Sequence, residues 1–135
     1  MGVDYGEKRI GIAASDEGRL IATPHSVIRH GGWGPDIRAI KRLMTELDAA
    51  YVVLGLPLNT DRSEGFQARE VRLFAGQLMA SGVHVDFADE RYTSIEAEEA
   101  LIKGGLTRAE RKNKVDQVAA ALILQGYLDR QRETL

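Results

Sequence analysis

Three carboxylate residues, scattered along a chain of 135 residues, are the residues best suited to chemistry. The first, Asp4, stands between Val3 and Tyr5 in an apolar segment that ends at Gly6. If that segment is a central strand of a sheet, an aspartate there is costly unless something pairs with it, and a metal ion is one such partner. A solvent-facing or turn-capping role explains Asp4 alone equally well.

The other two carboxylates, Glu90 and Asp116, also stand where a site could form. Glu90 comes shortly after an expected strand, and open α/β sheets bind ligands beyond the carboxyl ends of their parallel strands. An ordinary ion pair with Arg91 is an equally good explanation of Glu90. Asp116 lies near the start of a segment, residues 115–124, that is apolar on nearly every side and therefore predicts a buried helix. Asp116 could merely favour the helix dipole, but the burial favours a position in a cleft beside the sheet.

Together, the three carboxylates have the chemistry of a site for divalent metal ions. Clustered, buried carboxylates repel one another and raise each other's pKa, so a metal-free cluster would hold protons. Mg²⁺ and Mn²⁺ prefer oxygen ligands of this kind. Two such ions about 3.5–4 Å apart can activate a water molecule and stabilise the leaving oxygen of a phosphodiester. Spacing along the chain does not show that the carboxylates converge, and the three histidines have no metal-ligand spacing.

The elements expected to position these residues begin with three strands. Apolar or β-branched runs occur at residues 3–5, 10–14 and 20–28, with turn-forming residues at 6–8 and 16–18. These runs predict a short antiparallel meander. The glycine-rich segment 31–34 that follows predicts a mobile loop.

From residue 35 onward the pattern alternates between helices and strands. The expected elements are a helix over 35–47, a strand at 51–55, a helix over 66–79, a strand at 83–87, a helix over 93–103 and a long helix over 115–130. Thr93 with Glu96, and Thr107 with Glu110, are possible capping boxes at helix starts. Helical crossovers force parallel pairing of the later strands. The sequence therefore predicts an α/β fold, with a mixed five-stranded sheet flanked by helices.

Length and composition limit the function. A chain of this length predicts one domain over residues 1–135. With a formal charge of −2 and a pI near 5.9, the protein is not a general polyanion binder, so contact with nucleic acid needs a local basic surface. The lack of cysteine excludes disulfides and thiolate metal sites and suits a cytoplasmic location. No signal-peptide pattern is visible, and no apolar run is long enough to span a membrane.

Four segments, in order along almost the whole chain, resemble the motifs of the YqgF family, also called RuvX. Residues 4–13 resemble its opening D-x-G-x-K-R-I-G-x-A, residues 55–65 its central G-L-P segment with a following acidic residue and glycine, residues 89–94 its D-E-R-x-[ST]-[ST], and residues 114–125 its K-x-D-x-x-A-A-x-x-I-L helix. One segment alone would be weak evidence, whereas four in register are strong.

The resemblance implies an RNase H-like fold, similar to that of Holliday-junction resolvases of the RuvC type. The family's acidic positions correspond here to Asp4, Glu90 and Asp116, which implies a metal-dependent endonuclease that uses one or two Mg²⁺ or Mn²⁺ ions. Family members are associated with maturing the 5′ end of the 16S ribosomal RNA precursor, and earlier with Holliday-junction resolution, so a branched-DNA resolvase stays open. Family sequences usually carry several residues before the first motif, so the first strand is expected to be short here.

Basic residues near the motifs are candidate contacts for the phosphates of a nucleic-acid partner. Lys8, Arg9, Arg62 and Arg91 accompany the motifs, while Arg111, Lys112 and Lys114, together with Arg108, form the only dense basic segment. Solvation or pairing with nearby acidic residues explains them about as well. Trp33 and Tyr92 could stack on bases, but in a chain with only 6% aromatic residues a packing role is the expected one.

Two other function classes stay open. An actin-like ATPase or sugar kinase also opens with D-x-G, but such proteins pair two domains, for which 135 residues leave no room. A nucleic-acid-binding module without catalysis would have no reason to keep all three carboxylates. The oligomeric state is not predicted, because a resolvase that cuts two symmetry-related strands should be a dimer whereas an RNA processor can act as a monomer.

Overall fold

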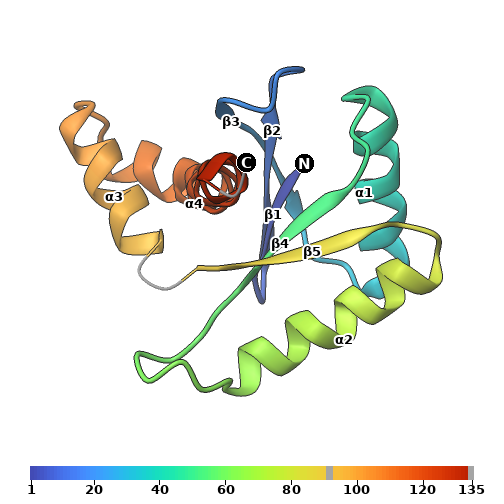
Figure 1. The fold of residues 1–135 in the computed structure, drawn as a ribbon. Helices are drawn as coiled ribbons and strands as arrows, with labels where there is room; N and C mark the ends of the chain where they lie inside the picture. Colours follow the sequence, from blue (N-terminus) through green and yellow to red (C-terminus); the bar gives the residue numbers. More distant parts are fainter. Residues whose placement is uncertain (91–92, 134–135) are drawn as a thin grey trace.

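The computed structural model describes residues 1–90 and 93–133, and its elements follow the expected order (Figure 1). The strands are β1 (Gly2–Tyr5), β2 (Arg9–Ser15), β3 (Ala22–Arg29), β4 (Val52–Leu56) and β5 (Val85–Asp89). The helices are α1 (Trp33–Glu46), α2 (Phe66–Ala80), α3 (Thr93–Lys103) and α4 (Arg108–Glu133).

The strands form one mixed sheet in the order β3-β2-β1-β4-β5, which puts β1 in the middle. β2 pairs antiparallel with both β1 and β3, whereas β4 pairs parallel with both β1 and β5. The predicted meander and the predicted parallel half of the sheet are therefore confirmed. Because β1, β4 and β5 run parallel, their carboxyl ends at Tyr5, Leu56 and Asp89 lie at the same edge of the sheet.

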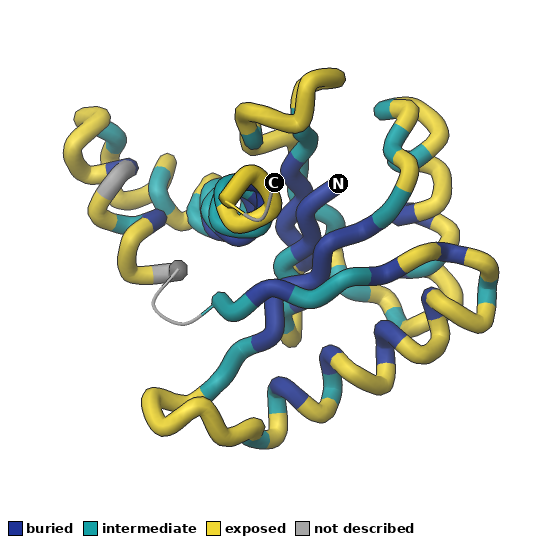
Figure 2. Tube along the Cα trace, in the orientation of Figure 1, coloured by how far each residue is buried: buried dark blue, intermediate teal, exposed yellow. Residues whose placement is uncertain are grey.

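Helices cover both faces of the sheet (Figure 1). The face under α1 and α2 holds the larger core, in which Ile10 and Phe74 are fully buried. α4 crosses the other face, where Ala120 and Leu124 pack against the sheet, and α3 packs against α4. Figure 2 shows the buried strands between these layers, with the outer sides of the helices exposed.

Glycines in the sheet let α4 come close. A Cβ atom at Gly2 would lie 2.8 Å from Cβ of Leu124, and one at Gly11 would lie 2.0 Å from the backbone oxygen of Asp116. Any larger residue at these positions would push the helix away. The alanine-rich α4 therefore approaches the sheet closely, and the glycines of the sheet contribute to this approach as much as the helix does.

Two strands begin two residues later than predicted. Leu20 and Ile21 lie in a turn before β3, because the Asp16 carboxylate accepts hydrogen bonds from their N–H groups at 2.7 and 3.1 Å. Before β5, the N–H of Val83 donates to the oxygen of Leu78 at 3.1 Å, so this residue belongs to the turn that closes α2 and does not start the strand. In both places a local hydrogen bond outweighs the β propensity of the side chains.

Two helices begin earlier than predicted. Trp33 starts α1 inside the segment expected to be a loop. At the start of α4, Thr107 and Glu110 form the predicted capping box, with N–H to side-chain-oxygen bonds of 3.0 and 3.3 Å. α4 begins directly after Thr107, so the basic segment lies on the first helical turns of α4 itself. The side chain of Thr93, in the other expected box, lies outside the described residues. No helix in the described ranges is long and apolar enough to cross a membrane.

Candidate active site

Asp4 lies in the central strand, on the face that α4 covers. Successive residues of a strand point to opposite faces, so Asp4 shares its face with Gly2, whereas Tyr5 belongs to the core under α1 and α2. Directly opposite Asp4 in β2 is Gly11, the residue over which α4 passes. The side chain of Asp4 is half-buried, and this burial raises the pKa of its carboxyl group. Asp4 was a candidate metal ligand on the condition that its segment is a central strand, and this condition is met.

The sheet brings Glu90 to Asp4. Glu90 directly follows β5, and its N–H donates to the oxygen of Leu56 at the end of β4, the strand between β5 and β1. The carboxyl groups of Asp4 and Glu90 hydrogen-bond to each other. Burial, reinforced by the negative charge of Asp4, raises the pKa of Glu90 to about 9. The proton of this hydrogen bond is therefore retained by the pair well above the ordinary pKa of a glutamate.

A glycine in β4 makes room for this pair. A Cβ atom on Gly55 would lie 2.5 Å from Oε2 of Glu90 and 2.5 Å from Cδ1 of Ile123 in α4. A larger residue would therefore displace both the carboxyl group and the helix. This explains physically why the strand Val52–Leu56, otherwise built from valine and leucine, carries a glycine at its fourth position.

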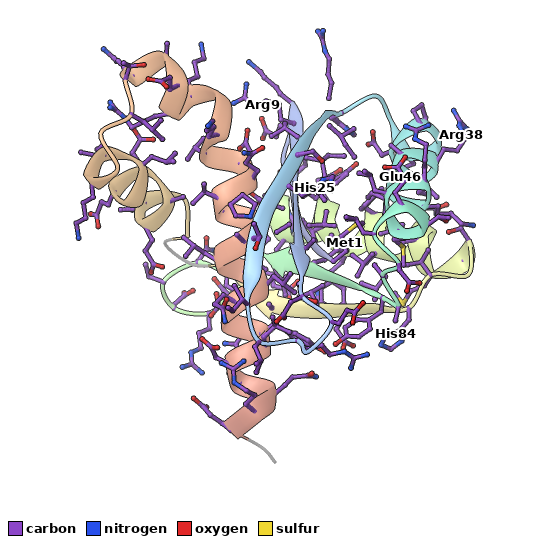
Figure 3. The ribbon with its side chains drawn as sticks, turned by 90° about the horizontal axis from the view of Figure 1, so that it is seen from above. Met1, Arg9, His25, Arg38, Glu46 and His84 are labelled. Carbon is purple, nitrogen blue, oxygen red and sulfur yellow. The ribbon has the colours of Figure 1, made fainter. Side chains whose placement is uncertain are left out.

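Asp116 joins the site from α4. The charge of Asp116 contributes, after burial, to the raised pKa of Asp4, so the two carboxylates lie close enough to interact. The Asp116 carboxylate accepts a hydrogen bond of 2.6 Å from Nε of Arg9, the first residue of β2. Figure 3 shows Arg9 beside the N-terminal half of α4. All three predicted carboxylates thus gather near one edge of the sheet, with Arg9 neutralising the one that α4 supplies.

The three carboxylates do not form a ready-made metal cage. Within residues 1–90 and 93–133, no three acidic, histidine or cysteine side chains lie close enough together to hold an ion. As placed, Asp4 and Glu90 hydrogen-bond to each other, while Asp116 pairs with Arg9. A divalent cation would offset the same negative charge, and carboxylate oxygens are ligands that Mg²⁺ and Mn²⁺ prefer. The three carboxylates therefore have the chemistry that such an ion requires, although as placed they do not enclose one.

A basic cavity of about 580 Å³ is lined by Val115, the residue before Asp116, and by Arg9, its ion-pair partner. Three cations line it: Arg9 from β2, and Arg108 and Lys112 from the first turns of α4. Glu98 of α3 also lines it, but its carboxylate accepts a 3.0 Å hydrogen bond from Nε of Arg111. The cavity therefore presents net positive charge beside the carboxylates, which is the local basic surface that an acidic protein needs to hold phosphates.

Among the described residues, the others predicted to contact phosphates do not line the basic cavity. Arg111 is held in the structure, since it donates to Glu98 and, at 3.0 Å, to the oxygen of Leu106. Lys8, Arg62 and Lys114 are exposed and do not line the basic cavity. Arg91, like Tyr92, lies outside the described residues. Of the seven predicted residues, the structure thus gathers Arg9 and Lys112 near the carboxylates and adds Arg108, which the sequence placed only in a charge run.

A buried polar cluster before α1 was not predicted. Asp36 is only 1% exposed, and its carboxylate hydrogen-bonds to Nδ1 of His30 and accepts the N–H of Gly31 at 2.9 Å. The hydroxyl of Tyr5 donates to the same carboxylate at 3.5 Å. The only signal in the sequence was a histidine and an aspartate on either side of a glycine-rich segment, and that spacing resembles no metal-ligand pattern.

Known proteins match this chain along nearly its full length. The model of the family RuvX, described as "Holliday junction resolvase", matches residues 1–130. A protein of Ruegeria pomeroyi named "Putative pre-16S rRNA nuclease" is 44% identical over 132 residues, which cover 97% of this chain and 86% of that protein. A protein of the same name from Anaeromyxobacter is 44% identical over 130 residues, covering 96% of this chain and 95% of its own.

Solved structures share the fold at low identity. RuvC of Thermus thermophilus, in complex with a Holliday junction substrate, superposes with a TM-score of 0.61 at 18% identity and covers 98% of this chain and 94% of its own. The Fowlpox virus resolvase, bound to Holliday junction DNA, has a TM-score of 0.53 at 16% identity, with 96% of each chain covered. These likenesses confirm the predicted RNase H-like fold. With the family model matched over 1–130 and relatives at 44% identity, the chain belongs to the RuvX family.

Proposed function

We propose that this chain is a metal-dependent endonuclease in which Asp4, Glu90 and Asp116 hold one or two Mg²⁺ or Mn²⁺ ions. Membership of the RuvX family makes it a nuclease, a hydrolase of phosphodiester bonds. The observation that carries the residue assignment is the buried pair of hydrogen-bonded carboxyls, Asp4 and Glu90, at the shared carboxyl edge of the parallel strands, with Asp116 beside them. Open α/β sheets bind their ligands at this edge.

The ion would supply a bound water of lowered pKa and a charge that stabilises the leaving oxygen. The residues of the chain prepare its place. Glu90 must release its proton before it can act as a ligand, as metal ligands generally do. Arg9 must leave Asp116, and its guanidinium then faces the basic cavity, where it can hold a phosphate next to the cleaved bond. Arg108 and Lys112 would hold flanking phosphates in the same cavity.

The substrate that we favour is a ribosomal RNA precursor, cut during maturation of its 5′ end. The support is the name shared by the relatives at 44% identity. A branched DNA junction is the second candidate, supported by the description of the family and by the junction complexes of the structural neighbours. Residues 1–135 would act as one nuclease domain. The lack of cysteine fits the reducing cytoplasm in which such a precursor is processed.

A cleavage assay with matched variants tests this proposal. Wild type, Asp4→Asn, Glu90→Gln and the control Glu17→Gln are incubated with Mg²⁺ or Mn²⁺ and labelled nucleic acid. Glu17 is an exposed acidic residue in the turn between β2 and β3, at the end of β2 opposite to Arg9. The two site variants should lose cleavage by about 10³-fold, while the control keeps it. Equal cleavage by wild type and Asp4→Asn would remove Asp4 from the mechanism.

Parallel substrates decide between the two candidates. A precursor of 16S ribosomal RNA and a four-way DNA junction are compared at equal concentration, and preference for the junction would overturn the choice of RNA. Calorimetry with Mn²⁺ gives a readout that does not depend on cleavage, since Asp4→Asn should weaken metal binding in the absence of nucleic acid. Sedimentation of the protein with each substrate reports whether two copies act together, as symmetric junction cleavage requires.

A further inference from the structure

A second cavity lies at the same end of β1 as the carboxylates, but on the opposite face of the sheet. Its volume is about 420 Å³, within the range of roughly 300–1,000 Å³ that small-ligand sites occupy. Its lining comes from the end of β1 and the turn after it, from the segment before α1 and from the first turns of α1 and α2. The residues that matter below are Tyr5, Glu7, His30, Trp33, Phe66 and Glu70.

Two aromatic side chains at this cavity are exposed. Trp33, the first residue of α1, is 41% exposed, and Phe66, the first residue of α2, is 64% exposed. One exposed apolar side chain is ordinary on a protein surface. Two large aromatic rings from different helices that line one cavity need a further explanation. The expectation that Trp33 is a packing residue is therefore only partly met, and its ring is available for stacking on a planar ligand.

The inner wall of the cavity is fixed. The ring of Tyr5 stacks on Phe74 with centroids 4.0 Å apart, and meets the ring of His30 edge-on at 5.3 Å. His30 is held in turn by the buried Asp36, to which its Nδ1 is hydrogen-bonded. A ligand would therefore meet a preformed surface and would not have to order it, which favours binding. This gives the Asp36 cluster a role in shaping a site.

The charge at the cavity selects the kind of ligand. Glu7 and Glu70 line it, and no lysine or arginine does so among the described residues. Two carboxylates repel a phosphate but accept hydrogen bonds from amino groups. The two carboxylates and the two aromatic rings therefore favour a planar group that carries an amino group and no negative charge. A planar nucleobase with an exocyclic amine fits this description, and the phosphates attached to it would lie outside the cavity, away from Glu7 and Glu70.

We propose that this cavity binds one unpaired nucleobase of the substrate, stacked on Trp33 and Phe66, with its exocyclic amino group at Glu70. The proposal rests on the proposed nuclease function, since it assumes that a nucleic-acid strand lies at the carboxylates. Asp4 and Tyr5 are consecutive residues that serve opposite faces of the sheet. A strand held at Asp4 thus passes the end of β1 at Gly6, and the base of a neighbouring nucleotide enters the cavity. Adenine, cytosine and guanine qualify, whereas uracil lacks the amino group.

The single tryptophan of the chain makes this binding directly measurable. Fluorescence of Trp33 is followed while the protein is titrated with RNA octamers of adenine, of cytosine, of uracil, and with an abasic octamer of equal charge. EDTA is present throughout, so no cleavage interferes. The adenine and cytosine octamers should quench Trp33, the uracil octamer should bind several-fold more weakly, and the abasic octamer should not quench. Quenching by the abasic octamer equal to that by adenine would overturn the proposal.

Matched variants on one helix separate stacking from general effects. Phe66→Leu should weaken binding of the adenine octamer by roughly tenfold, the loss expected for one base–aromatic stack, and leave abasic binding unchanged. The control Leu73→Ala alters a residue of α2 that is 54% exposed and does not line the cavity, so its binding should stay at the wild-type value. Circular dichroism verifies that both variants fold. Equal binding of adenine by the two variants would refute the base site.

Failure of this proposal is distinguishable from failure of the proposed function. Asp4→Asn should lose cleavage but keep the quenching of Trp33 by the adenine octamer. If Asp4→Asn still cleaves, the assignment of the carboxylates is wrong while the base site stands. If cleavage depends on Asp4 but adenine and abasic octamers behave alike, the nuclease stands and the base site is wrong.

Discussion

The close contact between β2 and α4 leads to the most quantitative prediction, the effect of Gly11→Ala. Within a strand, replacing glycine by alanine normally stabilises a protein, because glycine loses the most conformational freedom on folding. Here the added Cβ would lie 2.0 Å from the backbone oxygen of Asp116 and 2.5 Å from its carbonyl carbon. To restore an ordinary contact of 3.4 Å, α4 must retreat from β2 by about 1.4 Å at this point.

The expected loss of stability follows from what has to move. Extra methyl groups in a packed core cost about 1–3 kcal/mol where side chains can adjust. At Gly11 the neighbour is the backbone of a helix of 26 residues, which cannot turn aside. We therefore expect a loss of about 3 kcal/mol in the free energy of unfolding, and a fall in melting temperature on the order of 10 °C. Because Asp116 is the residue displaced, binding of Mn²⁺ should also weaken.

Urea denaturation with a matched glycine tests this reasoning. Gly126 lies in α4 itself, and a Cβ added there has no heavy atom within 4 Å. Gly126→Ala should therefore raise the free energy of unfolding by about 0.5–1 kcal/mol, the usual gain within a helix. The denaturation slope should stay equal in all three proteins, so that midpoints report stability alone. If Gly11→Ala is as stable as wild type, the close approach of α4 to the sheet is refuted.

Three further predictions concern the ion pair between Arg9 and Asp116 of α4 and the capping box at the start of α4. Arg9→Gln should raise the affinity for Mn²⁺ up to about fivefold, because Asp116 loses a competing partner. The same change should weaken binding of nucleic acid and lower its salt dependence by about one phosphate contact. Calorimetry measures the first effect and salt titration the second, and a fall in both affinities would contradict the competition between Arg9 and the metal ion. Thr107→Ala removes a cap of α4 and should cost about 1 kcal/mol in the free energy of unfolding, whereas Thr107→Ser should cost less. The hydrogen bond from the Thr107 N–H lowers the pKa of Glu110. At a pH above the ordinary pKa of glutamate, Glu110→Gln should therefore melt at a lower temperature than wild type, and the difference in melting temperature should vanish as the pH falls through the lowered pKa. A difference that persists in acid would rule out the charged cap.

The order of the elements and the layout of the sheet could be predicted because each depends on local patterns. The spacing of apolar residues gave all five strands and the four helices of the described residues, and helical crossovers required the parallel half of the sheet. Boundaries were harder, since single hydrogen bonds decide them. The turn held by Asp16, and the bond from Val83 back to α2, have no signature in hydrophobicity.

The carboxylates of the site could be predicted as candidates, but their pairing could not. That Asp4 faces Glu90 depends on β4 lying between their strands, which is a matter of sheet order and not of spacing. The partner of Arg9 could not be predicted either, because Asp116 lies 107 residues further along the chain, whereas Glu7 lies close to Arg9 in the sequence. The cavity at Trp33 and Phe66 combines residues from three separate segments of the chain, so no single motif contains it.

The opening motif can now be explained residue by residue. Arg9 and Gly11 are two positions apart in β2, so both belong to the face that α4 covers, while Ile10 lies in the core on the opposite face. Gly11 lets α4 approach until Asp116 comes within reach of Arg9, and Arg9 then offsets the charge that Asp116 brings to the site. Replacing Gly11 by a larger residue would therefore break the ion pair, although neither Arg9 nor Asp116 is itself substituted. The motif thus links the packing of the last helix to the charge balance of the carboxylates, and a variant that alters one should alter the other.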